Sequence, residues 1–152
     1  MKRIGNGLTG FFISKELISL KYTLRYVWIK VGVFSAIVTP ITAAEVLVKP
    51  LKKGQMSIAD KYRHAIRNMP NISNIKFDVE IGFMAGSLRA KYGLPLPDML
   101  QVAAALAQPA NAIITNDRDI QRVRETNVFL LSDLATWYLD FHESEARPTG
   151  EN

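Results

Sequence analysis

The chain has no cysteine in its 152 residues. That absence excludes a disulfide framework, a thiolate zinc site and a cysteine nucleophile. Histidine is also scarce, because His64 and His142 are the only two and each is isolated in the sequence. We therefore expect both histidines to be surface residues rather than metal ligands or general bases.

Long apolar runs without charge are missing as well. The most apolar region, residues 17–41, is interrupted by Lys21, Arg25 and Lys30, so no window of about 20 residues could form a spanning helix. The basic residues 1–7 are not followed by a small-residue cleavage site, which argues against a signal peptide. We expect a cytoplasmic protein without a membrane segment, and the lack of cysteine is compatible with the cytosol.

The chain does contain enough apolar sequence to form a core. With 152 residues, of which 48% are hydrophobic, it is expected to form one domain and not to be disordered. We assign this domain to residues 1–141, with an atypical start over residues 1–16. Residues 142–152 are assigned to a polar tail.

The net charge of +5 conceals an uneven distribution. Residues 1–76 carry 13 Lys and Arg against 3 Asp and Glu, whereas residues 77–152 carry 6 against 11. A basic surface favours a polyanion such as RNA. The alternative is that these basic residues only solvate helix faces. Three arginines lie near one acidic turn, namely Arg118, Arg122 and Arg124. They either contact the phosphate groups of a polyanion or are only solvated surface residues.

Strand patterns alternate with helix patterns along the chain. Strands are predicted at residues 33–39, 75–77, 112–115 and 128–131, and helices at residues 17–30, 42–48, 57–68, 79–92, 97–107 and 133–141. Thr42 is expected to cap its helix, which residues 49–54 interrupt. Ser57 and Asp60 resemble a capping box, and Gly93 is a stop signal. This alternation predicts an α/β fold with a parallel sheet flanked by helices.

Three acidic residues lie at positions that are costly for a charge. Asp98 opens an apolar helix, Asp117 follows a buried strand, and Glu45 lies within an apolar run. A carboxylate at the end of a core element needs a partner, and Mg²⁺ or Mn²⁺ prefers oxygen ligands. Asp117 also falls at the carboxyl end of a strand, where α/β sheets bind their ligands.

Each acid also has a plain structural interpretation. The helix dipole stabilises a carboxylate in the first turn, where Asp98 lies. Asp117 suits a turn, in which Asn and Asp form local hydrogen bonds. Glu45 either faces solvent or pairs with Lys49, four residues along the helix.

The segments around these acids resemble the PIN domain, and most closely the VapC-type toxins of bacterial toxin–antitoxin pairs. The resemblance covers roughly residues 33–134, and three short motifs carry it in the family's order: residues 42–47 (TAAEVL), 92–98 (YGLPLPD) and 115–117 (TND). It implies a PIN-like three-layer sandwich with a central parallel sheet.

The resemblance also implies an activity and partners. A protein of this kind would be an endoribonuclease that uses Mg²⁺ or Mn²⁺ to hydrolyse RNA phosphodiester bonds, with a small antitoxin as partner and a homodimer as assembly. Glu45, Asp98 and Asp117 would be the catalytic metal ligands. The polar groups that support them would be Thr42, Thr115 and Asn116.

The start of the chain departs from the family pattern. The first strand of similar PIN domains ends in Asp, whereas residues 8–13 (LTGFFI) are the best counterpart here and place Leu8 at the position of that acid. Two other hypotheses therefore stay open. One is a catalytically impaired PIN module that binds RNA or an antitoxin without cleaving. The other is a structural α/β domain whose three acids are caps or surface residues.

Overall fold

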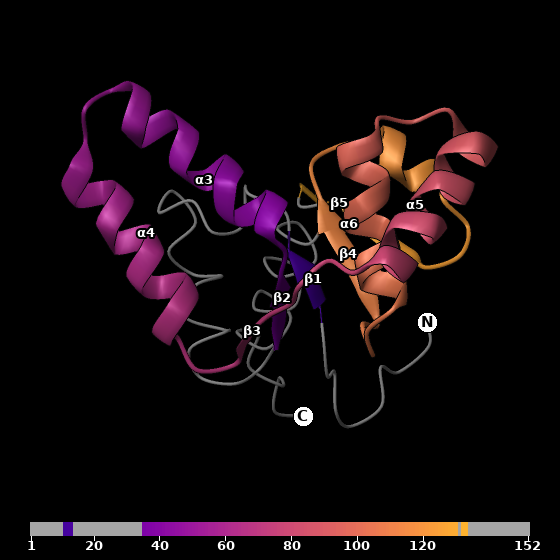
Figure 1. Cartoon of the computed structure of the whole chain (residues 1–152), viewed down its shortest axis with the longest axis horizontal. Helices are drawn as coiled ribbons and strands as arrows, with labels where there is room; N and C mark the ends of the chain where they lie inside the picture. Colours follow the sequence, from indigo (N-terminus) through magenta and orange to yellow (C-terminus); the bar gives the residue numbers. More distant parts are fainter. Residues whose placement is uncertain (1–10, 14–34, 131, 134–152) are drawn as a thin grey trace, which may run out of the picture.

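A computed structural model of the chain describes residues 11–13, 35–130 and 132–133. The predicted helix at 17–30, the last predicted helix beyond residue 133 and the tail at 142–152 lie outside these residues. The elements follow the predicted alternation of strands and helices (Figure 1). In chain order they are β1 Phe11–Ile13, β2 Ala36–Val38, α3 Pro40–Lys52, α4 Met56–Asn68, β3 Ile72–Asn74, α5 Val79–Tyr92, α6 Leu96–Leu106, β4 Ala112–Thr115, the 3-10 turn η1 Asp119–Arg122, and β5 Asn127–Leu130.

The strands form one five-stranded sheet in the order β3-β2-β1-β4-β5. Every neighbouring pair is parallel, as the sequence predicts. Because β1 lies between β2 and β4, the carboxyl ends of these three strands are adjacent along one edge of the sheet. We call that edge the carboxyl edge.

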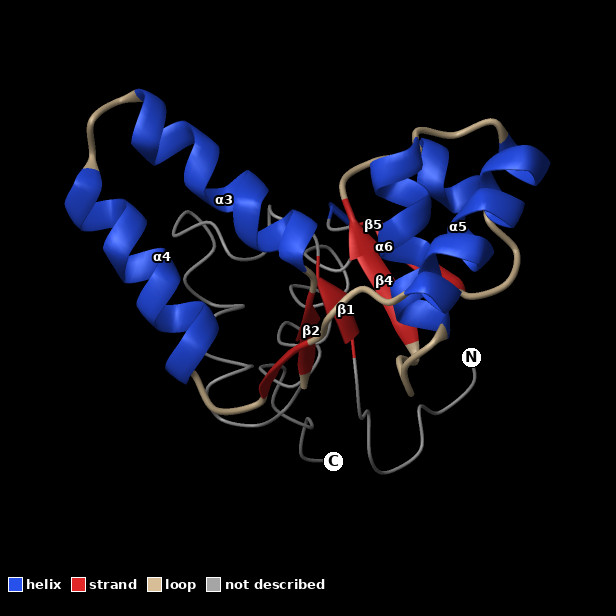
Figure 2. Cartoon of the chain, in the orientation of Figure 1, coloured by secondary structure: helices blue, strands red, loops and turns tan. Residues whose placement is uncertain are grey.

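Helices cover both faces of the sheet, with α3 and α4 on one side and α5 and α6 on the other (Figure 2). Successive strand residues point to opposite faces, and β2 shows both. Ile37 belongs to the apolar core that α5 and α6 form. Val38 packs with Val46 of α3 and Ile66 of α4. The fold is therefore the predicted three-layer arrangement. The strand order reverses after β3, because β4 pairs with the other side of β1. With the right-handed crossovers that parallel strands normally have, the helices before and after this reversal cover opposite faces.

Several predicted boundaries are corrected by the structure. Thr39, not Thr42, caps α3, because its side chain accepts a hydrogen bond from the Thr42 backbone N–H. Pro50 does not interrupt that helix, which continues to Lys52 with the proline ring buried. The cap position of α4 is Gln55, so the predicted capping box does not form.

The third strand also differs from its prediction. It covers Ile72–Asn74 instead of residues 75–77, and it pairs with β2 residue by residue. In contrast, α5 has the predicted bounds, and Gly93 ends it with a φ of 68°. None of the helices in the described part of the chain has the length and apolar character needed to cross a membrane.

Candidate metal and nuclease site

The buried polar side chains of the described residues gather at the carboxyl edge. They are Thr39 after β2, Thr42 in the first turn of α3, and Thr115 at the end of β4. A buried hydroxyl is costly unless it finds a hydrogen-bond partner. Their concentration at this edge marks it as the most polar part of an otherwise apolar interior.

Two of these hydroxyls form a chain that joins α3 to α6. The Oγ1 atoms of Thr39 and Thr42 lie 3.2 Å apart. The Thr42 hydroxyl then donates to Oε1 of Gln101 at 3.0 Å. Gln101 is a polar residue in the middle of the apolar helix α6, so this bond fixes the contact between the two helices.

Glu45 and Asp98 each lie three residues from one end of this bond. Glu45 follows Thr42 on α3, and Asp98 precedes Gln101 on α6. Residues three apart share a helix face. The bond therefore joins the two helix faces that carry these carboxylates, and both residues are half-buried. The structure thus brings Glu45 and Asp98 to neighbouring helices at the carboxyl edge.

Asp117 is placed differently from the other two acids. It is exposed and lies in a turn after β4, where Thr115 Oγ1 accepts from the Asp117 N–H at 3.0 Å. Its own Oδ1 accepts from the Asp119 N–H at 2.8 Å. The local turn interpretation of Asp117 therefore describes its contacts here, and Asn116 beside it is exposed.

Within residues 11–13, 35–130 and 132–133, no group of three or more His, Cys, Asp or Glu side chains has a spacing that would hold a metal ion. The three predicted acids are therefore not gathered into one compact cluster. Leu8, the predicted counterpart of the family's first acid, lies outside the described residues. Since β1 starts at Phe11, Leu8 precedes the strand in sequence, whereas Ser14 follows it.

The chemistry of the available donors fits a hard divalent ion. Mg²⁺ commonly takes only one or two protein carboxylates and keeps several waters or substrate phosphate oxygens. Glu45 and Asp98 would supply two carboxylates, each three residues along its helix from one partner of the Thr42–Gln101 hydrogen bond. Carboxylate oxygen atoms are ligands that such an ion prefers.

Sequence reasoning missed two residues of this edge. Thr39 directly precedes Pro40, and a threonine before a proline at the first helical position is a cap signal. Gln101 gave a weaker signal as a polar residue within the apolar run of α6. Nothing in the sequence alone pairs Gln101 with Thr42, which is 59 residues away.

A second polar group joins the end of α5 to the loop before β5. Glu125 accepts from Lys91 Nζ at 2.8 Å and from the Tyr92 hydroxyl at 2.6 Å. The hydrogen bond from Lys91, followed by that from Tyr92, lowers the pKa of Glu125 to about 2. The same contact with Glu125 raises the pKa of Lys91. This group connects two layers of the fold.

Comparison with known proteins assigns the chain to a family. The sequence model of the PIN domain matches residues 21–126, so the chain belongs to the PIN domain family. A search of curated protein sequences finds no match.

Solved structures share the fold at low sequence identity. One is VapBC2 from Rickettsia felis bound to a DNA fragment from its promoter, with 15% identity, a TM-score of 0.63, and coverage of 80% of this chain and 98% of that chain. Another is a toxin–antitoxin complex from Klebsiella pneumoniae, with 21% identity, a TM-score of 0.56, and coverage of 78% and 94%. A third is a Pyrobaculum aerophilum protein, with 12% identity, a TM-score of 0.60, and coverage of 90% and 99%.

Proposed function

We propose that this PIN domain is a metal-dependent endoribonuclease of the VapC toxin type, acting in the cytoplasm. The observation that carries the proposal is the hydrogen bond between Thr42 and Gln101, which joins the helix faces of Glu45 and Asp98 at the carboxyl edge. Membership of the PIN family and the shared fold with toxin–antitoxin proteins support the assignment.

In this proposal Glu45 and Asp98 hold a Mg²⁺ or Mn²⁺ ion, and Asp117 provides a third carboxylate from the turn after β4. When bound, the ion supplies an activated water and neutralises charge on the phosphodiester. Thr42 orients α3 through Gln101, while Thr115 holds the backbone of the Asp117 turn. Asn116 is the exposed polar group beside that turn.

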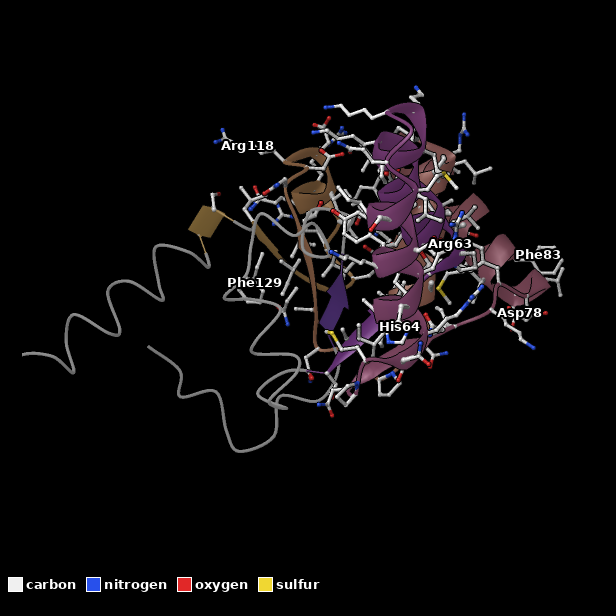
Figure 3. All side chains as sticks on the ribbon, turned by 90° about the vertical axis from the view of Figure 1, so that its left-hand side faces the viewer. Arg63, His64, Asp78, Phe83, Arg118 and Phe129 are labelled. Atoms are coloured by element: carbon white, nitrogen blue, oxygen red, sulfur yellow. The ribbon has the colours of Figure 1, made fainter. Side chains whose placement is uncertain are left out.

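The proposed substrate is RNA, and positive charge near the acidic turn supports this choice. Arg118 directly follows Asp117, and its side chain extends away from the fold in Figure 3. Arg122 lies one turn further in η1 and donates to the Tyr92 carbonyl oxygen at 3.3 Å. An arginine beside the cleavage site binds phosphate through its planar group of N–H donors.

The proposed protein partners follow from the shared fold. Two of the similar solved structures are toxin–antitoxin assemblies. We therefore propose a small antitoxin as the partner that regulates this domain, and a homodimer as its assembly.

RNA cleavage by matched acid variants tests the activity. We expect wild-type protein to cleave single-stranded RNA when Mn²⁺ is present and to stop when EDTA removes it. Asp98→Asn should lower the rate at least tenfold, because it removes a proposed metal ligand. The control is Asp60→Asn, which removes an exposed acid on α4 that pairs with Arg63. Equal rates for both variants would contradict the assignment of Asp98.

A second function is supported by one specific observation. The described residues contain no three-ligand metal group. An impaired PIN module that binds RNA or an antitoxin without cleaving would agree with this. It predicts that wild-type protein binds RNA with Mn²⁺ present but produces no cleavage products, even at high protein concentration.

A further inference from the structure

Tyr92 ties the end of α5 to the segment between β4 and β5. It is the last residue of α5, and its ring packs against the apolar core. Its hydroxyl donates to Glu125 Oε2 at 2.6 Å and accepts from the Arg124 N–H at 3.1 Å. Its carbonyl oxygen accepts from Arg122 Nη2 at 3.3 Å. One residue of α5 is therefore hydrogen-bonded to three residues near the end of that segment.

Charge strengthens these contacts. Glu125 is ionised at neutral pH, because its pKa is lowered to about 2. Hydrogen bonds to an ionised carboxylate are shorter and stronger than those between neutral groups. The last carbonyls of a helix have no partner within it and favour a nearby cation, which Arg122 supplies to the Tyr92 carbonyl. An exposed ion pair alone contributes little, but these groups form one network.

The segment that Tyr92 holds also carries Asp117. Residues 116–126 join β4 to β5, with Asp117 near the start and the partners of Tyr92 near the end. This connection is longer than most in compact domains. Two buried side chains, Ile120 and Val123, attach its middle to the core. The contacts of Tyr92 therefore fix the end of a segment whose start presents an exposed carboxylate.

Tyr92 is also close to Asp98 along the chain. The buried residue Leu94 follows α5, and α6 then begins at Leu96 with Asp98 in its first turn. The contacts of Tyr92 therefore join the segment that carries Asp117 to the short connection that leads to Asp98. Two of the three proposed metal ligands meet structurally through this one residue.

We propose that Tyr92 is a positioning residue of the metal site, because its contacts hold the segment with Asp117 in a fixed place relative to the start of α6. The inference rests on the proposed function, in which Asp98 and Asp117 bind the same divalent ion. Without these contacts the segment would adopt more conformations, and binding the ion would have to order it, which lowers affinity. Tyr92 acts through Asp117 and is not itself a ligand.

The Mn²⁺ affinity of Tyr92→Phe, measured by calorimetry, tests this role. The variant keeps the ring in the core and loses only the hydroxyl, so we expect it to fold. It should bind Mn²⁺ about fivefold more weakly, a smaller loss than removal of a direct partner of a ligand causes. The control Tyr62→Phe removes the hydroxyl of a half-buried tyrosine on α4 and should bind as wild type does. If Tyr92→Phe binds as tightly as wild type, the inference is overturned although the metal site stands.

A double-mutant cycle separates positioning from general damage. If Tyr92 acts through Asp117, Tyr92→Phe should weaken Mn²⁺ binding in wild-type protein but have no further effect in Asp117→Asn. A merely structural role would lower the affinity by the same factor in both backgrounds, and that result would overturn the inference. No Mn²⁺ binding in wild-type protein would overturn the proposed metal site and the role of Tyr92 with it.

Amide hydrogen exchange, followed by NMR, tests the positioning without any metal. The Asp119 N–H donates to Asp117 Oδ1, so its exchange rate reports on the order of that turn. We expect this amide to exchange roughly threefold faster in Tyr92→Phe than in wild type, because a less stable segment opens more often. Tyr62→Phe should leave the rate unchanged. Equal rates in all three proteins would overturn the inference, even if the Mn²⁺ affinity of Tyr92→Phe falls.

Discussion

The Thr42 hydroxyl has a polar partner on each side. It lies 3.2 Å from the Thr39 hydroxyl and donates to Gln101 at 3.0 Å. The sequence indicated Thr42 through its place in a family motif, but it gave Gln101 no role. A long-range contact between two side chains depends on how α3 and α6 pack, and no local pattern encodes that packing.

Gln101 should influence metal affinity without being a ligand. Replacing it in Gln101→Leu removes the acceptor of Thr42, which releases the helix faces that carry Glu45 and Asp98. We expect the Mn²⁺ affinity, measured by calorimetry, to fall roughly tenfold, as is usual when a group that orients a ligand is lost. The free energy of unfolding should fall by about 1 kcal/mol, since the hydrogen bond from the Thr42 hydroxyl to α6 is lost.

Two further variants separate this effect from general damage. Gln101→Glu keeps an acceptor oxygen for Thr42 and should retain the affinity for Mn²⁺. Gln55→Leu, at the exposed start of α4, should bind Mn²⁺ as wild type does. An unchanged Mn²⁺ affinity in Gln101→Leu would show that Gln101 does not support the metal site.

Glu125 should make the free energy of unfolding depend on pH in the acidic range. Its pKa in the folded state is lowered to about 2 from an ordinary value of 4.5, so it stabilises the fold above pH 4.5. That contribution disappears as the pH falls from 4.5 through 2. In urea unfolding at pH 5 and pH 3, we expect Glu125→Gln to lose less stability between the two pH values than wild type. An equal loss in both proteins would count against the Lys91 and Tyr92 contacts.

At the scale of elements, helix ends were predictable where a single residue type enforces them. Gly93 ends α5 in a left-handed conformation, which glycine adopts without strain. The starts of α3 and α4 were harder to predict. Ser57 and Asp60 have the spacing of a capping box, but the helix begins at Met56, one residue earlier. A polar residue near a helix start does not reveal by itself whether it lies before or inside the first turn.

Thr39 should contribute measurably to the stability of α3. In Thr39→Ala the backbone N–H of Thr42 loses its acceptor, and we expect the free energy of unfolding to fall by about 1–2 kcal/mol. Thr39→Ser keeps the hydroxyl and should lose less. Chemical denaturation of the three proteins measures both effects, and an equal loss in the two variants would show that the methyl group, not the cap, matters.

Gly93 should tolerate asparagine better than alanine. Its φ of 68° is strained for most side chains, so Gly93→Ala should lower the free energy of unfolding by about 1 kcal/mol. Asparagine visits this conformation more readily, so Gly93→Asn should cost less. Thermal unfolding of both variants checks the order, and a more stable alanine variant would contradict it.

At the scale of the whole molecule, the parallel sheet and its two helical layers follow from the alternation of sequence patterns. Strand order does not follow from alternation alone, because β4 returns to pair with β1 across a gap of about a hundred residues. The sequence placed Asp98 and Asp117 at the ends of core elements and Glu45 within an apolar run. The structure places Glu45 and Asp98 each three residues from one partner of an interhelical hydrogen bond, and it places Asp117 in a turn.

Titration of Mn²⁺ by calorimetry into wild-type protein and into Asp98→Asn decides whether Glu45 and Asp98 bind a divalent ion. If Glu45 and Asp98 form a divalent metal site at the carboxyl edge, wild-type protein binds the ion and the variant loses at least tenfold in affinity. Binding of equal affinity in both proteins, or no binding in wild type, would contradict that claim.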